Sequence, residues 1–146
     1  MASSYTVSWA GLWGGPDKSE TIEVTYAVTA NAGDGAVTNI STNTDTIADG
    51  RTYTQLIRGK SLKAVEAFPT SGGTAPDAAD VTVKDSDGLD LLNGNGTSLI
   101  HATDKQSTYP MIDGQAAVIP VRGALTIGVA NQSTASANFT LRLTFV

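Results

Sequence analysis

Alternation of apolar and polar residues is the dominant pattern along this chain. Residues 21–29 place an apolar side chain at every second position, and residues 137–145 repeat the pattern. Successive side chains of a strand point to opposite faces of the sheet, so each run predicts a strand with one buried and one solvent-facing side. The segment 125–129, with Leu125, Ile127 and Val129, predicts a third strand of the same kind.

Shorter segments extend this prediction. We expect further strands at residues 5–9, 36–41, 53–58, 81–84 and 117–121. Pro120 cannot donate a ladder hydrogen bond, so the last of these should lie at a sheet edge or carry a bulge. Residues 61–68 show apolar side chains at every third position, as in a helix, but Leu62, Ala64 and Phe68 also fit one strand face. The segment is short for a helix, and we predict a strand.

Turn-forming residues separate these segments. Glycine, asparagine and aspartate gather at positions 14–17, 31–35, 49–50, 71–73, 87–88, 93–96 and 113–114. Many short strands with frequent turns favour a sandwich or a barrel, and without crossover helices the strands must pair antiparallel. We therefore predict one domain over residues 1–146, an all-β antiparallel β-sandwich of the jelly-roll or immunoglobulin-like type. Residues 1–15 form either its first strand or an N-terminal arm.

Composition removes several function classes. The chain has 146 residues, no cysteine and a formal net charge of −5. Lack of cysteine excludes a disulfide scaffold, a zinc-thiolate site and a cysteine nucleophile. An acidic chain without a basic run is a poor nucleic-acid binder, and no apolar stretch approaches the roughly 18 residues of a membrane span. Without a visible signal peptide, we expect synthesis in a cytoplasm.

Two groups of residues could in principle form a reactive site. The single histidine, His101, has Ser98 before it and Asp104 after it in one polar loop. A nucleophile, base and acid are normally brought together from separate rigid elements, so this spacing indicates a solvated loop histidine. The triplet Gly59-Lys60-Ser61 lacks the earlier glycine of a phosphate-binding loop, because position 54 is threonine. We expect no enzyme activity and no cofactor.

Three aspartates surround one glycine. Asp85, Asp87 and Asp90 around Gly88 are similar to a calcium loop, whose oxygen ligands crowd one cation. The third ligand before the glycine and the distal glutamate of that motif are both missing. We therefore predict a hairpin turn between residues 81–84 and 89–92, with a weak divalent-ion site as the alternative.

Other residues suggest a binding surface. Trp9 continues the alternation of Tyr5 and Val7, so we expect it to end a strand inside the core. Trp13, beside Leu12 and among glycines, could be an interface anchor, a sugar-stacking platform or a structural lid. The basic residues Arg51, Arg58, Lys60 and Lys63 could dock an acidic protein surface or simply form a solvated sheet face. The candidate partner-interface residues are Leu12, Trp13, Arg58 and Lys63.

A family resemblance covers roughly residues 58–146. It is carried by Lys63-Ala64-Val65-Glu66-Ala67-Phe68-Pro69, Gly72-Gly73-Thr74-Ala75-Pro76, Asp80-Val81-Thr82-Val83-Lys84-Asp85-Ser86-Asp87-Gly88-Leu89-Asp90-Leu91-Leu92, Ala117-Val118-Ile119-Pro120-Val121 and Gly123-Ala124-Leu125-Thr126-Ile127. This part resembles small structural proteins encoded among the virion morphogenesis genes of tailed bacteriophages. There, a Gly-Gly-Thr-Ala-Pro turn precedes a strand, an Asp-X-Asp-Gly-X-Asp turn, a glycine- and asparagine-rich loop and a closing hairpin.

The resemblance implies a capsid decoration (cement) protein. Such a protein is a small β-sandwich, often a homotrimer, on the capsid surface of the virion. Its partners would be the major capsid protein and copies of itself, and the resemblance supplies no catalytic residue. Alternatives are a neck or tail structural protein of the same fold, and a carbohydrate-binding or host-adhesion module acting through Trp13. Low charge favours assembly, because neutral hydroxyls on the polar strand faces cost less to desolvate than ions.

Overall fold

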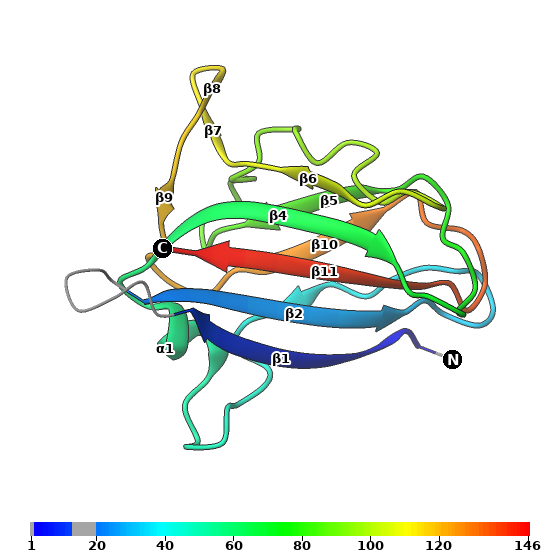
Figure 1. The fold of residues 1–146 in the computed structure, drawn as a ribbon, viewed down its shortest axis with the longest axis horizontal. Coiled ribbons are helices and arrows are strands. Elements are labelled where there is room, and N and C mark those ends of the chain that lie inside the picture. Colours follow the sequence, from blue (N-terminus) through cyan, green and yellow to red (C-terminus); the bar gives the residue numbers. More distant parts are fainter. Residues whose placement is uncertain (1, 13–19) are drawn as a thin grey trace.

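The structure, a computed structural model, describes residues 2–12 and 20–146 as two antiparallel sheets packed face to face (Figure 1). In the described residues the larger sheet has the strand order β1 (Ser4–Leu12), β2 (Thr21–Thr29), β11 (Asn138–Phe145) and β4 (Ser61–Pro69). The far side of β4 pairs with two short strands, β6 (Gln106–Thr108) and β9 (Ile119–Pro120). The smaller sheet is β3 (Ile40–Ser41), β10 (Thr126–Ala130) and β5 (Asp80–Lys84). A hairpin of β7 (Met111–Ile112) and β8 (Gln115–Ala116) projects from the body (Figure 1). The predicted all-β sandwich is confirmed.

The core lies between the two sheets and follows the alternation in the sequence. Apolar residues of β2 and β11 face it, and residues of β5 and β10 meet them from the other side. Tyr26, Phe139 and Leu141 are each exposed by 1% or less. Strands β2 and β11 pair in continuous register from Asn138↔Thr29 to Phe145↔Ile22. The strongest sequence pattern therefore became the two central strands of the larger sheet.

Strand β4 confirms the strand prediction for residues 61–68 and explains its helix-like spacing. The register with β11 shifts between Thr144 and Phe145, so that Leu62 and Ala64 are paired and Lys63 is the extra residue of a bulge. A bulge reverses the alternation of the residues beyond it. Leu62 and Val65, three positions apart, are therefore both fully buried. The expected common face of Leu62, Ala64 and Phe68 was wrong for the same reason.

Some short strand predictions were wrong. Residues 53–58 contain the helix α1 (Tyr53–Ile57), which begins with a capping box. There the Thr52 hydroxyl accepts from the Gln55 backbone N–H at 3.2 Å, and the Gln55 side chain accepts from the Thr52 N–H at 2.8 Å. Residues 36–41 are extended only at β3, and residues 117–121 only at β9. As predicted for Pro120, β9 lies at an edge.

Trp9 does not end a strand in the core. Tyr5 and Val7 on the same side of β1 are partly buried and pack against the core, but Trp9 is 41% exposed. The alternation gave its side of the strand correctly. The opposing sheet has three described strands against six, so it leaves this end of the edge strand uncovered.

Among the described residues, no helix is long and apolar enough to cross a membrane.

Candidate interaction surfaces

Strand β1 forms a long free edge of the larger sheet. It pairs with β2 at all nine positions, from Ser4↔Thr29 to Leu12↔Thr21, and no described strand pairs with its other side (Figure 1). The nine residues include neither a charged residue nor a proline. Proteins usually protect such an edge with charges, proline, bulges or a covering segment. The outer side of β1 therefore offers main-chain donors and acceptors to a strand from another chain.

Polar contacts hold β1 in place from its inner side. The Tyr5 hydroxyl donates to Asp45 Oδ2 at 2.6 Å, and the Tyr5 ring meets Tyr26 edge-on with 5.8 Å between centroids. Burial, with the hydrogen bond to Asp45, raises the pKa of Tyr5 to about 12. Near the start of the strand, the Ser3 hydroxyl accepts from the Thr38 N–H at 2.8 Å. These contacts fix β1 as an ordered strand while its outer edge stays open.

The interface candidates predicted from the sequence fall at the end of the larger sheet where β1 finishes and β4 starts. Leu12, the last residue of β1, is 50% exposed. Arg58 is the exposed residue after α1, and Lys63 is the exposed residue of the β4 bulge. In the described part of the chain neither Arg58 nor Lys63 forms a salt bridge. Trp13 lies outside the described residues.

The two other basic residues of the predicted cluster are held by contacts within the chain. Arg51 pairs with Asp49, Nε to Oδ2, at 2.8 Å. Lys60 Nζ donates to the Glu20 carbonyl oxygen at 2.5 Å. The cluster is therefore divided, and Arg58 and Lys63 remain as the cations available to a partner.

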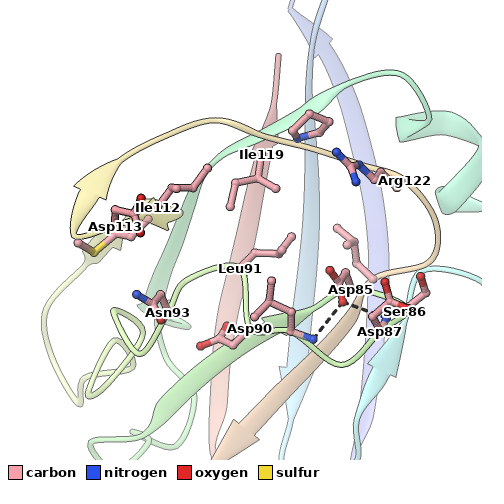
Figure 2. A pocket seen from close by; sticks show the side chains of 14 residues that line it. Asp85, Ser86, Asp87, Asp90, Leu91, Asn93, Ile112, Asp113, Ile119 and Arg122 are labelled. Atoms are coloured by element: carbon pink, nitrogen blue, oxygen red, sulfur yellow. Dashed lines mark hydrogen bonds between the residues drawn. The ribbon is translucent and has the colours of Figure 1, made fainter.

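A hollow of about 510 Å³ lies at the opposite edge of the larger sheet (Figure 2). There the neighbour of β4 is interrupted, since β6 pairs with residues 65–67 and β9 with residues 61–62. Between β6 and β9 the chain leaves the sheet as the β7–β8 hairpin, whose turn residues Asp113 and Gly114 have φ values of 49° and 76°. The hairpin overhangs the gap, and the hollow lies beneath it.

The hollow combines apolar walls with acidic charge. Its lining includes Asp85, Ser86, Asp87, Leu89, Asp90, Leu91, Asn93, Met111, Ile112, Asp113, Ile119, Pro120, Arg122 and Leu125. Figure 2 shows Ile112 and Asp113 on one side and Asp85 and Asp87 on the other. Ile112 is 53% exposed and Leu89 is 64% exposed. Four aspartates against one arginine give this apolar surface a negative rim.

The aspartates of residues 85–90 shape a turn, as predicted. Asp85 Oδ1 accepts the N–H groups of Asp87 and Leu89, both at 3.0 Å, and Gly88 has a φ of 85°. Asp90 Oδ1 accepts the N–H groups of Val83 and Leu92, both at 3.1 Å. No group of three or more potential ligands in the described residues is placed to hold a metal ion. The predicted hairpin is short: Asp90 bridges to Lys84, and the Asp85 and Leu91 N–H groups donate to the carbonyl oxygens of Leu89 and Val83 at 3.0 and 2.8 Å, but residues 89–92 do not form a full strand.

His101 has a structural role in its loop. Its Nδ1 accepts the backbone N–H groups of Thr103 at 3.2 Å and Asp104 at 3.1 Å. The Ser98 N–H is held by Asp80 Oδ1 at 2.7 Å. Ser98, His101 and Asp104 are therefore held through contacts that order their own loops, and no hydrogen bond joins Ser98 to His101.

Comparison with known proteins adds little to this geometry. No protein-family model matches the chain, and no curated protein matches its sequence. A solved structure similar to the chain is titled "Cyanophage Pam1 capsid asymmetric unit". The likeness covers 99% of this chain and 85% of that one, at 14% identity and a TM-score of 0.37. A TM-score this low does not establish a shared fold, so the likeness decides nothing about function.

Sequence reasoning missed the hollow. Its walls come from three separate segments, residues 85–93, 111–113 and 119–125. The Asp113-Gly114 pair was readable as a turn, but nothing in the alternation shows that the hairpin overhangs a gap in the sheet. The available signal was the isolated apolar residues in polar surroundings, which the structure leaves exposed: Leu89, Tyr109, Ile112 and Val118.

Proposed function

We propose that this protein is a structural component of a tailed-bacteriophage virion, and that it decorates the head as a cement protein bound to the major capsid protein. The resemblance of residues 58–146 to small virion proteins suggests the class. The observation that carries the proposal is the free, uncharged edge of β1. A strand of a neighbouring protein can add to such an edge, with main-chain hydrogen bonds providing affinity.

The surface chemistry beside this edge supports a binding role. Alternate residues of β1 that face away from the core are neutral, among them Ser4, Thr6 and Ser8, and Thr25 and Thr29 continue this surface on β2. Neutral hydroxyls cost less to desolvate than charged groups. Contacts that are weak singly become strong when a symmetric shell repeats them and several copies of the chain bind together. We therefore propose self-association, as a trimer, and a location on the capsid surface, with no catalytic activity and no cofactor.

The direct test is binding to heads that lack the protein. Purified protein is mixed with such heads from the parent phage, pelleted, and viewed by negative-stain microscopy, and the breakage temperature of the heads is measured. We expect a fixed ratio of bound protein, regular surface knobs and a higher breakage temperature. Failure to bind heads contradicts the cement role, and binding to neck or tail particles instead would assign the protein there.

A matched pair of substitutions tests the β1 edge. Ser8→Lys places a charge on β1, and Ser107→Lys makes the same change on β6, at the opposite edge of the same sheet. We expect Ser8→Lys to weaken head binding by about tenfold or more, equivalent to about 1.4 kcal/mol. Ser107→Lys should leave binding unchanged, because it places the same charge at the other edge of the sheet, away from β1. Equal losses from both variants would rule out β1 as the docking edge.

A further inference from the structure

Two exposed apolar surfaces of opposite charge lie on this chain. The first, the acidic hollow, consists of the apolar Leu89 and Ile112 with the aspartates Asp87 and Asp113 among its lining. The second, the basic shoulder, consists of Leu12, Arg58 and Lys63. Each surface has exposed apolar area and an excess of one charge: Arg122 is the minority charge in the hollow, and the Glu20 carboxylate beside Gly11 is the minority charge near the shoulder. They are therefore complementary in both respects.

Charges on both surfaces are available to a partner. Asp85 and Asp90 are engaged by backbone N–H groups, but the described contacts give the carboxylates of Asp87 and Asp113 no hydrogen-bond partner. On the shoulder, the described residues provide no carboxylate within salt-bridge distance of Arg58 or Lys63. A charge without a partner inside the chain is free to pair with an opposite charge on a second molecule, and that pairing offsets the solvation the charge loses when it is covered.

The two surfaces flank β9 at one end of the sandwich. The Val121 N–H donates to the Lys60 carbonyl oxygen at 2.9 Å, and Ser61 pairs with Pro120. The junction between α1 and β4, which carries the shoulder cations, therefore lies against β9, whose Ile119 and Pro120 form a wall of the hollow. Figure 1 shows α1 and β9 near the C-terminus. The two surfaces are therefore adjacent at one end of the sandwich.

We propose that the basic shoulder of one copy docks in the acidic hollow of a second copy. The contact joins two different surfaces, so it is heterologous, and repeated contacts close into a ring when the rotation between copies allows it. A net charge of −5 makes copies repel one another at long range, so association needs such a local match of opposite charges. The contact between copies is argued from the two surfaces alone. Only the expected number of copies, three, rests on the proposed function.

The test exchanges the charges of the two surfaces. Hollow variant Asp87→Lys/Asp113→Lys replaces the two carboxylates without a partner by cations, and Asp113 already holds a φ of 49° in an exposed turn, so the lysine there needs no new backbone conformation. Shoulder variant Arg58→Glu/Lys63→Glu reverses the cations. Sedimentation equilibrium of the full chain measures association at low and at physiological salt. We expect each variant alone to raise the dissociation constant of the oligomer at least tenfold, and the four-fold combination to restore association.

Restoration by the combination distinguishes a direct contact from misfolding, since a damaged fold would not recover when more residues are changed. Asp104→Lys serves as the matched control, because Asp104 lies far from the hollow along β5. The loop of Asp104 follows Ile100, which bridges to Ala79 just before the start of β5. The hollow lies past the other end of that strand. This control should associate normally. A monomeric wild type, association indifferent to salt and to both variants, or a combination that stays monomeric would overturn the proposal.

The outcomes also separate this inference from the proposed function. Heads that bind a monomeric wild-type protein would overturn the ring and leave the cement role intact. Conversely, a salt-sensitive ring that fails to bind heads would support the contact between copies and contradict the cement role.

Discussion

The two edges of the larger sheet are built in opposite ways. The β1 edge is continuous over nine residues and carries no charge, no proline and no break in its pairing with β2. At the other edge, the neighbour of β4 is divided into the short strands β6 and β9, with Pro120 in β9. Interruption, proline and charge are the usual means of preventing strand addition. Among the described residues, one edge is thus protected and the other has no neighbouring strand.

The break between β6 and β9 at the divided edge creates a different kind of surface. Pro110 follows β6 and cannot donate a ladder hydrogen bond, and there the chain leaves the sheet. The hairpin returns where the Ala117 N–H donates to the Pro110 carbonyl oxygen at 2.9 Å. The gap beneath becomes the acidic hollow. Recognition at the β1 edge would use main-chain hydrogen bonds, and recognition at the divided edge would use side-chain shape and charge.

The largest expected difference between the two edges is in how much their buried side chains contribute to the free energy of unfolding. Leu62 on β4 is fully buried beside β9, and Val7 on β1 is only partly buried. We expect Leu62→Ala to lower the free energy of unfolding by about 2–5 kcal/mol, through lost burial and the cavity it leaves. Val7→Ala should cost about 1 kcal/mol, because it removes less buried area. Urea unfolding measures both, and similar losses would contradict the difference between the edges.

A second pair of substitutions compares β1 with its neighbour β2. Tyr5→Phe removes the hydroxyl that donates to Asp45, and we expect a loss of about 1 kcal/mol in the free energy of unfolding. The Tyr26 hydroxyl is buried and has no hydrogen-bond partner in the described residues. Tyr26→Phe should therefore be neutral or stabilising by up to about 1 kcal/mol. If Tyr26→Phe is the more damaging variant, the contact from Tyr5 is not what fixes the inner side of β1.

The central strands were predictable, and much of the edges was not. Strands β2 and β11 face the core on one side, so period-two alternation identified them. The Lys63 bulge mixed two periodicities in β4, and a single turn of helix at residues 53–57 was too short to show its own period. Its capping pair, Thr52 and Gln55, was a readable signal that the apolar pattern outweighed. The exposure of Trp9 depends on the width of the opposing sheet, and no local sequence pattern shows that width.

Candidate surfaces divide in the same way. Leu12 could be singled out beside Trp13 among glycines, and Arg58 and Lys63 as members of a basic cluster, and the structure leaves all three exposed. The acidic hollow depends on where the hairpin overhangs the β4 edge, so only the tertiary arrangement brings Asp87 and Asp113 to one cavity.

A smaller effect is expected in the hairpin. Gly114 has a φ of 76° with open space where a side chain would project. Gly114→Ala therefore strains the backbone without a clash, and we expect a local cost of about 1 kcal/mol. Hydrogen exchange at the Ala117 amide should become faster, because its bond to Pro110 closes the hairpin. Amides of β1 should exchange as in the wild type. If they become faster too, the two edges are coupled and the hairpin is not an independent feature.

The smallest expected effect is a pH dependence common to both edges. Asp77 accepts hydrogen bonds from the Ser133 N–H at 3.0 Å, the Ser133 hydroxyl at 2.5 Å and the Thr134 hydroxyl. These bonds, the Ser133 hydroxyl first, hold the pKa of Asp77 below its usual 3.8. A folded-state pKa below the unfolded one stabilises the fold above pH 3.8 and is lost as pH falls through the folded value.

Asp77→Asn should remove that contribution. The variant should be less stable than the wild type at neutral pH, and the difference should shrink as pH falls below 3.8. Urea unfolding across pH 2–7 measures it. Asp77 joins the segment before β5 to the one after β10, in the smaller sheet, so neither edge of the larger sheet should loosen before the other. A pH-dependent loss confined to the amides of β1 would contradict this expectation.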